Sequence, residues 1–240
     1  MSLRGLTHTL NPCAAASTSG RHACDMSASN DRSSMAMSTR RGLQAAAMTV
    51  AAGAALLVPT SPAYAATGVV QANTEFIFVN AAAGDRNSFF INQSGNTITV
   101  LDTRATLSAG PGCTLNGDGS VSCPAGNRTI ILAAGDQQDQ IAQRSHLRAS
   151  IDAGPGNDNV YGTSATNRQS IAGGEGRDYL SGGSADDVLV GGPGDDILAG
   201  GAGDDVLNNV DQNPRDSAQG GDGRDTCTSD PGDQELDCES

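Results

Sequence analysis

Aspartates recur every nine residues in the C-terminal part of the chain, and carboxylates at a fixed spacing can bind cations together. Four of them occupy the same place in consecutive nine-residue segments: Asp178, Asp187, Asp196 and Asp205. A carboxylate supplies a hard, charged oxygen, and calcium accepts such oxygens in a flexible cage, whereas magnesium requires stricter octahedral geometry. The spacing therefore indicates a row of calcium sites. It singles out no pair of carboxylates of the kind that a glycosidase needs.

The four segments run without a gap over residues 173–208 and read GGEGRDYLS, GGSADDVLV, GGPGDDILA and GGAGDDVLN. Glycine at the first, second and fourth places lets the backbone turn sharply with positive φ and brings carbonyl oxygens close to the centre of the turn. One glycine is missing, since Ala185 takes the fourth place of the second segment. The glycines expected to shape the calcium sites are Gly173, Gly174, Gly176, Gly182, Gly183, Gly191, Gly192, Gly194, Gly200, Gly201 and Gly203.

This pattern, G-G-x-G-x-D-x-U-x with an aliphatic residue eighth, resembles the calcium-binding repeats of the RTX (repeats-in-toxin) family. The resemblance implies a parallel β-roll in which an ion lies between turns on the same edge, so that repeat n pairs with repeat n+2. Asp178 would then pair with Asp196, and Asp187 with Asp205. The implied ligand is Ca²⁺.

The fold expected is all-β: a parallel β-roll, or β-solenoid, with calcium-binding turns and a short β-rich N-terminal cap. Each segment divides into a six-residue turn and a three-residue strand of mostly β-branched or aliphatic residues. Two segments close one coil, and coils stack at the ordinary spacing between strands, about 4.8 Å. The eighth residue of each repeat is predicted to point inward and stack on its counterparts.

Degenerate copies extend the pattern on both sides. Residues 134–142 and 153–161 place Asp139 and Asp158 sixth, and residues 220–228 place Asp225 sixth. If the eleven-residue stretches 162–172 and 209–219 are half-coils with longer turns, the inward ladder is Ile141, Ile151, Val160, Ile171, Leu180, Leu189, Leu198, Leu207, Ala218 and Cys227. One edge then holds Asp139, Asp158, Asp178, Asp196 and Asp216, and the other holds Ala149, Gln169, Asp187, Asp205 and Asp225. We therefore expect a longer ion row on the first edge.

The alternative is an ion-free solenoid, because Asp and Gly favour turns in any case. Turns alone, however, do not require aspartate at one fixed place. They also do not explain a second acid directly before it in three repeats, at Asp186, Asp195 and Asp204. Stacked like charges repel, and a bound cation relieves this most simply.

Three regions are expected: residues 1–65 as an N-terminal extension with a cleaved signal peptide, 66–132 as a β-rich cap or the first coils, and 133–240 as the β-roll with a cysteine-closed tail. Residues 40–65 combine two arginines, an apolar stretch and an A-x-A cleavage site at 63–65. A membrane anchor is disfavoured because the stretch is short and followed by prolines. We therefore expect a secreted, extracellular protein without a membrane segment after cleavage.

Four cysteines follow the cleavage site in two close pairs, Cys113 with Cys123 and Cys227 with Cys238. In an exported protein such pairs indicate two disulfides. A four-cysteine zinc site is the alternative, although the spacings lack a C-x-x-C knuckle.

Charge and motifs narrow the function classes. The formal net charge of the chain is −13, and residues 173–240 hold 17 acids against three arginines, which argues against nucleic acid as a partner. No H-E-x-x-H, G-x-S-x-G or P-loop pattern is present, and the region after the cleavage site has one histidine, His146. The sequence favours a secreted, non-catalytic calcium-binding protein. The alternatives are a calcium-dependent adhesion or extracellular-matrix protein that contacts a cell surface or extracellular polymer, and an unrecognised hydrolase.

Overall fold

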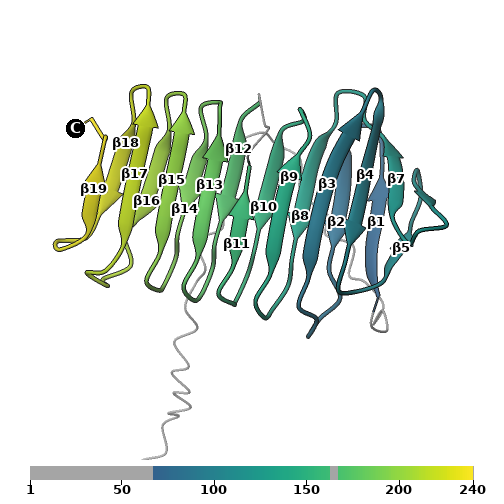
Figure 1. Cartoon of the computed structure of the whole chain (residues 1–240), viewed down its shortest axis with the longest axis horizontal. Coiled ribbons are helices and arrows are strands. Elements are labelled where there is room, and N and C mark those ends of the chain that lie inside the picture. The colour runs from purple at the N-terminus through teal and green to yellow at the C-terminus, as the bar shows by residue number, and fades with distance from the viewer. Residues whose placement is uncertain (1–66, 163–166, 240) are drawn as a thin grey trace, which may run out of the picture. The chain divides into compact units, whose positions relative to one another are not determined.

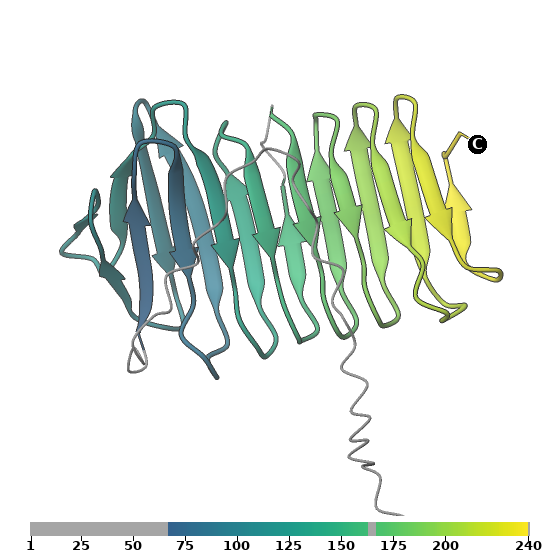
Figure 2. The ribbon, with the colours of Figure 1, turned by 180° about the vertical axis from the view of Figure 1, so that it is seen from behind.

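The computed structural model describes residues 67–162 and 167–239. These residues form two long sheets that face each other along a solenoid, and no helix occurs among them (Figures 1 and 2). The predicted signal region, residues 40–65, and the first two cysteines lie outside the described residues. Within the part of the chain that is described, no helix is long and apolar enough to cross a membrane.

From the eighth strand onward, each sheet takes every second strand of the chain, as in a coil that visits the two sheets in turn. The first sheet contains, in spatial order, β18 (Thr226–Ser229), β16 (Val206–Asn209), β14 (Val188–Val190), β12 (Gln169–Ala172), β10 (Ala149–Asp152), β8 (Thr129–Ala133), β2 (Phe76–Asn80), β1 (Gly68–Ala72) and β5 (Leu107–Ala109). The second contains β19 (Gln234–Leu236), β17 (Ser217–Asp222), β15 (Ile197–Ala202), β13 (Tyr179–Gly183), β11 (Asn159–Tyr161), β9 (Gln140–Arg144), β3 (Ser88–Ser94), β4 (Thr97–Asp102), β7 (Val121–Pro124) and β6 (Thr114–Leu115). From β8 to β19 all pairings within a sheet are parallel.

The predicted inward ladder is confirmed. In the second sheet the partners across neighbouring strands are Ile141, Val160, Leu180, Leu198 and Ala218 in sequence. In the first sheet they are Ile151, Ile171, Leu189, Leu207 and Cys227. All except Cys227 are at most 2% exposed. Ile171 and Ala218 therefore occupy the inward positions of the two eleven-residue stretches, and each stretch supplies one strand to a sheet.

The N-terminal region contributes both first-coil strands and a cap, the two arrangements that its sequence leaves open. β2 pairs in parallel with β8, and β3 in parallel with β9, so these two strands continue the solenoid. Antiparallel pairing begins beyond them, where β1 joins β2 and β4 joins β3. β7 and β6 extend this antiparallel end, which closes the solenoid over the core residues Val70, Ile98 and Val121.

Both predicted disulfides are present. Cys113 bonds Cys123 in the cap, and Cys227 bonds Cys238 at the opposite end. The second bond holds the C-terminal tail against β18, next to the last strand of the other sheet.

The glycines of the turns are required by backbone shape and by the stacking of coils. Gly176 has φ of +134°, and a Cβ at this residue would lie 1.4 Å from the carbonyl oxygen of Gly156, one coil away. Gly192 has φ of +111° and would place a Cβ 2.2 Å from the carbonyl oxygen of Gly174. No L side chain fits such positions without moving the neighbouring coil, so glycine at the second and fourth places sets the close approach of successive turns.

Candidate metal centre

The sixth-position aspartates form two buried rows, one along each edge of the solenoid. The first row holds Asp139, Asp158, Asp178, Asp196 and Asp216, and the second holds Asp187, Asp205 and Asp225, as the sequence predicts. Each side chain is at most 2% exposed. Carboxylates are seldom buried to this extent without a charged partner, and the only ion pair among the described residues lies elsewhere, between Arg215 and Asp195.

One oxygen of each carboxylate links neighbouring coils. The backbone N–H of Asp178 donates to Oδ1 of Asp196 at 2.8 Å, and that of Asp158 donates to Oδ1 of Asp178 at 2.8 Å. On the other edge Asp187 donates to Oδ1 of Asp205 at 2.7 Å. The pairing of repeat n with repeat n+2 is therefore present as a direct hydrogen bond. Aspartate at this place therefore has a structural role that needs no ion, because its Oδ1 atom joins neighbouring coils. The sequence alone did not predict this role.

The second oxygen of each carboxylate has no partner. The orphaned, buried Oδ2 atoms belong to Asp139, Asp158, Asp178, Asp187, Asp196, Asp205, Asp216 and Asp225. Leaving one buried polar atom unsatisfied costs about 1–3 kcal/mol. The unpartnered Oδ2 atoms repeat in register along both edges. A ligand shared between neighbouring turns would remove the cost at each of them.

The first glycine of each repeat lies beside this orphaned oxygen. A Cβ on Gly173 would be 2.3 Å from Oδ2 of Asp178 and 2.7 Å from the carbonyl oxygen of Gly191 in the next coil. At Gly200 the corresponding distances are 2.3 Å to Oδ2 of Asp205 and 2.6 Å to the carbonyl oxygen of Gly220. Each turn thus brings a carboxylate oxygen of its own repeat and a carbonyl oxygen of the next coil close to the glycine, where no side chain fits.

This donor set fits calcium. Within residues 67–162 and 167–239, no three Asp, Glu, His or Cys side chains gather closely enough to hold a metal by themselves. A cation at these turns would therefore need backbone carbonyls beside the carboxylates, and such mixed oxygen cages suit calcium. They do not suit zinc, which prefers nitrogen and sulfur ligands.

The upstream turn at Asp158 differs from the others. Its Oδ2 is equally buried and unpartnered, but Ala153 takes the place of the first glycine and is 0% exposed. A methyl group thus lies at the place where Gly173 carries only hydrogen, and Ala134 stands in the same way before Asp139. The turns of the regular repeats and those upstream are therefore not equivalent.

Burial raises the pKa of seven row carboxyls, because it disfavours their charged form; these are Asp139, Asp158, Asp178, Asp187, Asp196, Asp205 and Asp216. The pKa of Asp158, Asp187 and Asp196 is raised to about 7, and that of Asp178 to about 6. The backbone N–H bonds act against this rise, and the charges of neighbouring aspartates add to it in the first three. Without a cation, Asp158, Asp187 and Asp196 would be partly protonated near neutral pH.

The acids at the fifth place have a different role. Oδ1 of Asp186 accepts from the backbone N–H of Asp204 at 3.0 Å, and Oδ1 of Asp204 accepts from the backbone N–H of Arg224 at 3.0 Å. Asp186 and Asp204 are exposed, so these bonds cap the next coil from outside. These hydrogen bonds explain the second acid in two of the repeats, and no bound ion is needed for them. Repulsion between stacked acids is therefore no evidence for an ion at Asp186 and Asp204.

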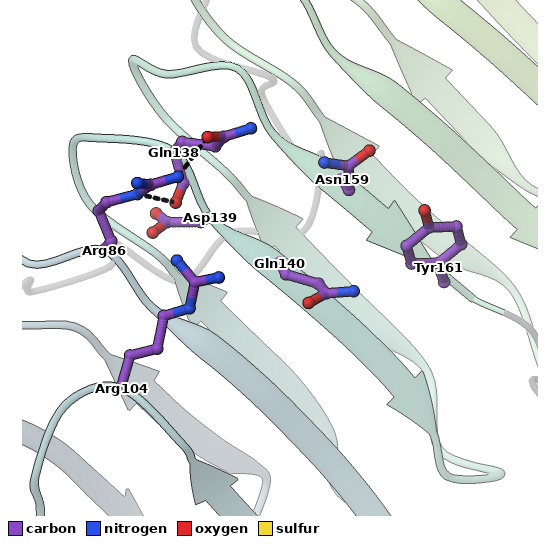
Figure 3. A pocket seen from close by; sticks show the side chains of 7 residues that line it. All are labelled: Arg86, Arg104, Gln138, Asp139, Gln140, Asn159 and Tyr161. Atoms are coloured by element: carbon purple, nitrogen blue, oxygen red, sulfur yellow. Dashed lines mark hydrogen bonds between the residues drawn. The ribbon is translucent and has the colours of Figure 1, made fainter.

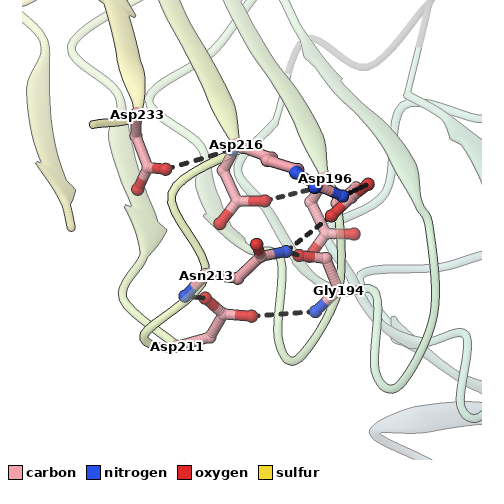
Figure 4. A network of polar contacts seen from close by, with 8 residues as sticks. Gly194, Asp196, Asp211, Asn213, Asp216 and Asp233 are labelled. Atoms are coloured by element: carbon pink, nitrogen blue, oxygen red, sulfur yellow. Dashed lines mark hydrogen bonds and ion pairs between the residues drawn. The ribbon is translucent and has the colours of Figure 1, made fainter. Parts of the chain in front are cut away.

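Both rows continue into the tail beyond the last repeat. The N–H of Asp216 donates to Oδ1 of Asp233 at 3.0 Å, and the N–H of Asp225 donates to Oε2 of Glu239 at 2.5 Å. Figure 4 shows Asp233, Asp216 and Asp196 in line along the first edge. These two acids take the place of sixth-position aspartates although no nonapeptide surrounds them, so the repeat pattern could not reveal them.

The longer turn 209–219 packs on the same edge. Oδ2 of Asp211 accepts from the backbone N–H of Gly194 at 2.8 Å, and Oδ1 of Asp211 accepts from the N–H of Asn213 at 2.6 Å (Figure 4). The amide of Asn213 in turn donates to Oδ1 of Asp195 at 2.6 Å. These contacts fix the turn against the coil before it and leave the Asp196–Asp216 pairing undisturbed.

Comparison with protein families supports this assignment. Residues 150–167 and 172–207 match the RTX calcium-binding nonapeptide repeat, in four copies. The repeat region therefore belongs to the RTX calcium-binding repeats, and the parallel β-roll expected from the resemblance is confirmed. Neither the comparison with curated proteins nor that with solved structures found a match.

Proposed function

We propose that this is a secreted, non-catalytic calcium-binding protein whose repeats fold around calcium ions held between stacked turns. The observation that carries the proposal is the register of buried, unpartnered Oδ2 atoms along both edges. Each lies in a turn of an RTX calcium-binding repeat or its continuation.

In this proposal the ligands are the sixth-position carboxylates and the carbonyl oxygens of the turn glycines. On the first edge Asp178 and Asp196 contribute with Gly173, Gly174, Gly176, Gly191, Gly192 and Gly194. On the second edge Asp187, Asp205 and Asp225 contribute with Gly182, Gly183, Gly200, Gly201 and Gly203. Asp158 joins the first row, but Ala153 places a buried methyl group in its turn, so we expect it to bind calcium more weakly. Bound calcium supplies the positive charge that the rows lack.

Calcium binding and folding would be linked, because a ligand that binds only the folded chain stabilises it. Ions between coils would satisfy the Oδ2 atoms and neutralise the stacked charges. Extracellular calcium modules commonly bind at ~10⁻⁴–10⁻³ M, so we expect the fold to form outside the cell, where calcium is abundant.

Export is supported by two kinds of observation. The stretch 40–65 has the composition of a cleavable signal. Both remaining cysteine pairs form disulfides, which persist in oxidising compartments. Mass spectrometry of protein recovered from the culture medium tests this, and we expect a mature N-terminus at Ala66 and no free thiol.

Equilibrium dialysis against calcium tests the ion sites directly. We expect several ions per chain, retained in excess magnesium, and fewer ions in Asp187→Asn. Asp186→Asn is the matched control, since Asp186 is the neighbouring acid but caps the coil from outside. Equal calcium content in the two variants, or no retention in magnesium, would refute the proposal.

A second candidate, the calcium-dependent adhesion or extracellular-matrix protein, is favoured by an arginine-lined pocket on the outer face of the second sheet.

A further inference from the structure

The outer face of the second sheet has a pocket where the cap meets the first coils. Its volume is about 270 Å³, and Arg86, Arg104, Gln138, Asp139, Gln140, Asn159 and Tyr161 line it. Arg86 precedes β3, Arg104 follows β4, and the remaining residues belong to β9, β11 and the turn before β9. Figure 3 shows the two arginines at one side of the pocket and Asn159 with Tyr161 at the other.

The arginines bring concentrated positive charge to an acidic protein. Both side chains are exposed, and among the described residues neither forms an ion pair. Arg86 donates to the carbonyl and side-chain oxygens of Gln138, which hold its guanidinium in place without neutralising it. Arg104 forms a hydrogen bond within the described residues only through its backbone N–H, to Oδ1 of Asp102.

Asp139 belongs to the pocket lining but lies beneath its surface. Its side chain is 1% exposed, and its Oδ1 accepts from the backbone N–H of Asn87 at 2.6 Å. The groups that a ligand would meet are therefore the guanidinium groups, the amides and the tyrosine. Guanidinium groups recognise planar carboxylates through paired N–H donors.

The rest of the lining suits a hydroxyl-rich ring. Gln140 and Asn159 each offer an amide donor and an amide acceptor, which is what sugar hydroxyls require. Tyr161 faces outward beside Tyr179, with ring centroids 5.5 Å apart, and the two rings form an amphipathic wall. The volume is slightly below that of pockets for drug-sized ligands, so it fits a single sugar ring with its substituents.

We propose that this pocket binds a carboxylated sugar, a uronic acid unit of an acidic polysaccharide, with Arg86 and Arg104 on the carboxylate and Gln140, Asn159 and Tyr161 on the ring. This goes beyond calcium binding, because it gives the outer face of the roll a ligand of its own. It would make the protein a calcium-folded module that attaches to an acidic extracellular polymer.

Isothermal titration of the calcium-loaded protein with trigalacturonic acid tests the proposal, with neutral maltotriose as the control ligand. The trisaccharide is short enough to avoid gelling with calcium. We expect saturable binding of trigalacturonic acid and none of maltotriose. Arg104→Gln and Arg86→Gln should each weaken binding about tenfold or more, because each removes a charged hydrogen-bond donor.

Arg148→Gln is the matched control, since it removes the same charge from an exposed arginine directly before β10, a strand of the other sheet. It should leave the affinity unchanged. No binding of trigalacturonic acid, or equal weakening by all three variants, would overturn the proposal, the latter because it would indicate general charge attraction alone. Circular dichroism of the same samples separates loss of the pocket from loss of the calcium-dependent fold.

Discussion

The backbone N–H of Asp178 donates a 2.8 Å hydrogen bond to Oδ1 of Asp196 one coil further on, while Oδ2 of Asp196 is buried without a partner. One carboxylate thus does two things: it joins neighbouring coils and it leaves an oxygen available in the turn. The same division recurs on the other edge between Asp187 and Asp205. Replacing the sixth-position aspartates by asparagine separates the two roles, because asparagine keeps an acceptor for the N–H and loses the charge.

We therefore predict that Asp205→Asn raises the calcium concentration at the folding midpoint severalfold. Its Oδ1 can still accept from Asp187, so the coil-to-coil bond survives while the anionic ligand is lost. A calcium titration followed by far-ultraviolet circular dichroism measures the midpoint. Asp204→Asn, the exposed neighbour that caps the next coil from outside, should leave the midpoint nearly unchanged. If both variants shift it equally, the effect is one of overall charge.

The stability of the ion-free roll should fall as pH rises. The pKa of Asp158, Asp187 and Asp196 is raised to about 7 in the fold, from an ordinary value of 3.8. The folded form therefore binds more protons than the unfolded form between these values. The protonated carboxyls favour the fold fully below about pH 4, and this contribution is lost as pH rises through about 7.

Thermal unfolding in a chelator at pH 4.5, 6 and 8 tests this, with the highest melting temperature expected at pH 4.5. Calcium should bind more weakly at the acid end, because protons compete for the same oxygens. A melting temperature that rises from pH 4.5 to pH 8 without calcium would contradict the assigned shifts.

The glycine at the fourth place should be intolerant of a side chain. In Gly176→Ala the new Cβ would lie 1.4 Å from the carbonyl oxygen of Gly156, at a φ that alanine rarely adopts. We expect a loss of at least about 2 kcal/mol in the free energy of unfolding, from overpacking and backbone strain together. Urea unfolding in saturating calcium measures it. Gly84→Ala should cost less, because Gly84 also has positive φ but no atom lies within 4 Å of its added Cβ.

The Cys227–Cys238 disulfide should hold the C-terminal end of the solenoid closed. Replacing both cysteines with serine releases the tail that carries Glu239, which accepts from the N–H of Asp225. The chain-entropy cost of freeing so short a loop is about 2–3 kcal/mol. Since solenoid coils contact only their neighbours, the loss should be local.

Hydrogen exchange should then accelerate in β18 and β19 and remain slow in β9 and β11. Uniform acceleration along the solenoid would show that the tail acts on the whole fold. Replacing Cys113 and Cys123 instead should confine the effect to the cap.

The repeated part of this fold could be predicted because every repeat meets the same structural requirements. One aliphatic residue per repeat has to face inward, so the ladder from Ile141 to Cys227 could be written from spacing alone, including Ile171 and Ala218 in the longer segments. The same register assigned the aspartates to their two edges. The close pairing of cysteines likewise led to both disulfides.

The remainder depends on contacts that no repeat encodes. Asp233 and Glu239 extend the rows because the tail folds back onto the last coil, and their spacing from the repeats is irregular. The role of Oδ1 as acceptor for the coil before it, and the outward capping by Asp186, depend on side-chain rotamers. The arginine pocket joins Arg86 and Arg104 to β9 and β11, which are distant in sequence.

Far-ultraviolet circular dichroism of residues 66–240 shows whether the repeats fold around calcium. The protein is first stripped with a chelator and then titrated with calcium, with magnesium titrated in parallel. We expect a cooperative gain of β signal near millimolar calcium and none with magnesium at the same concentration. A β-rich spectrum at neutral pH that does not change on chelation would contradict it, because the solenoid would then stand without ions.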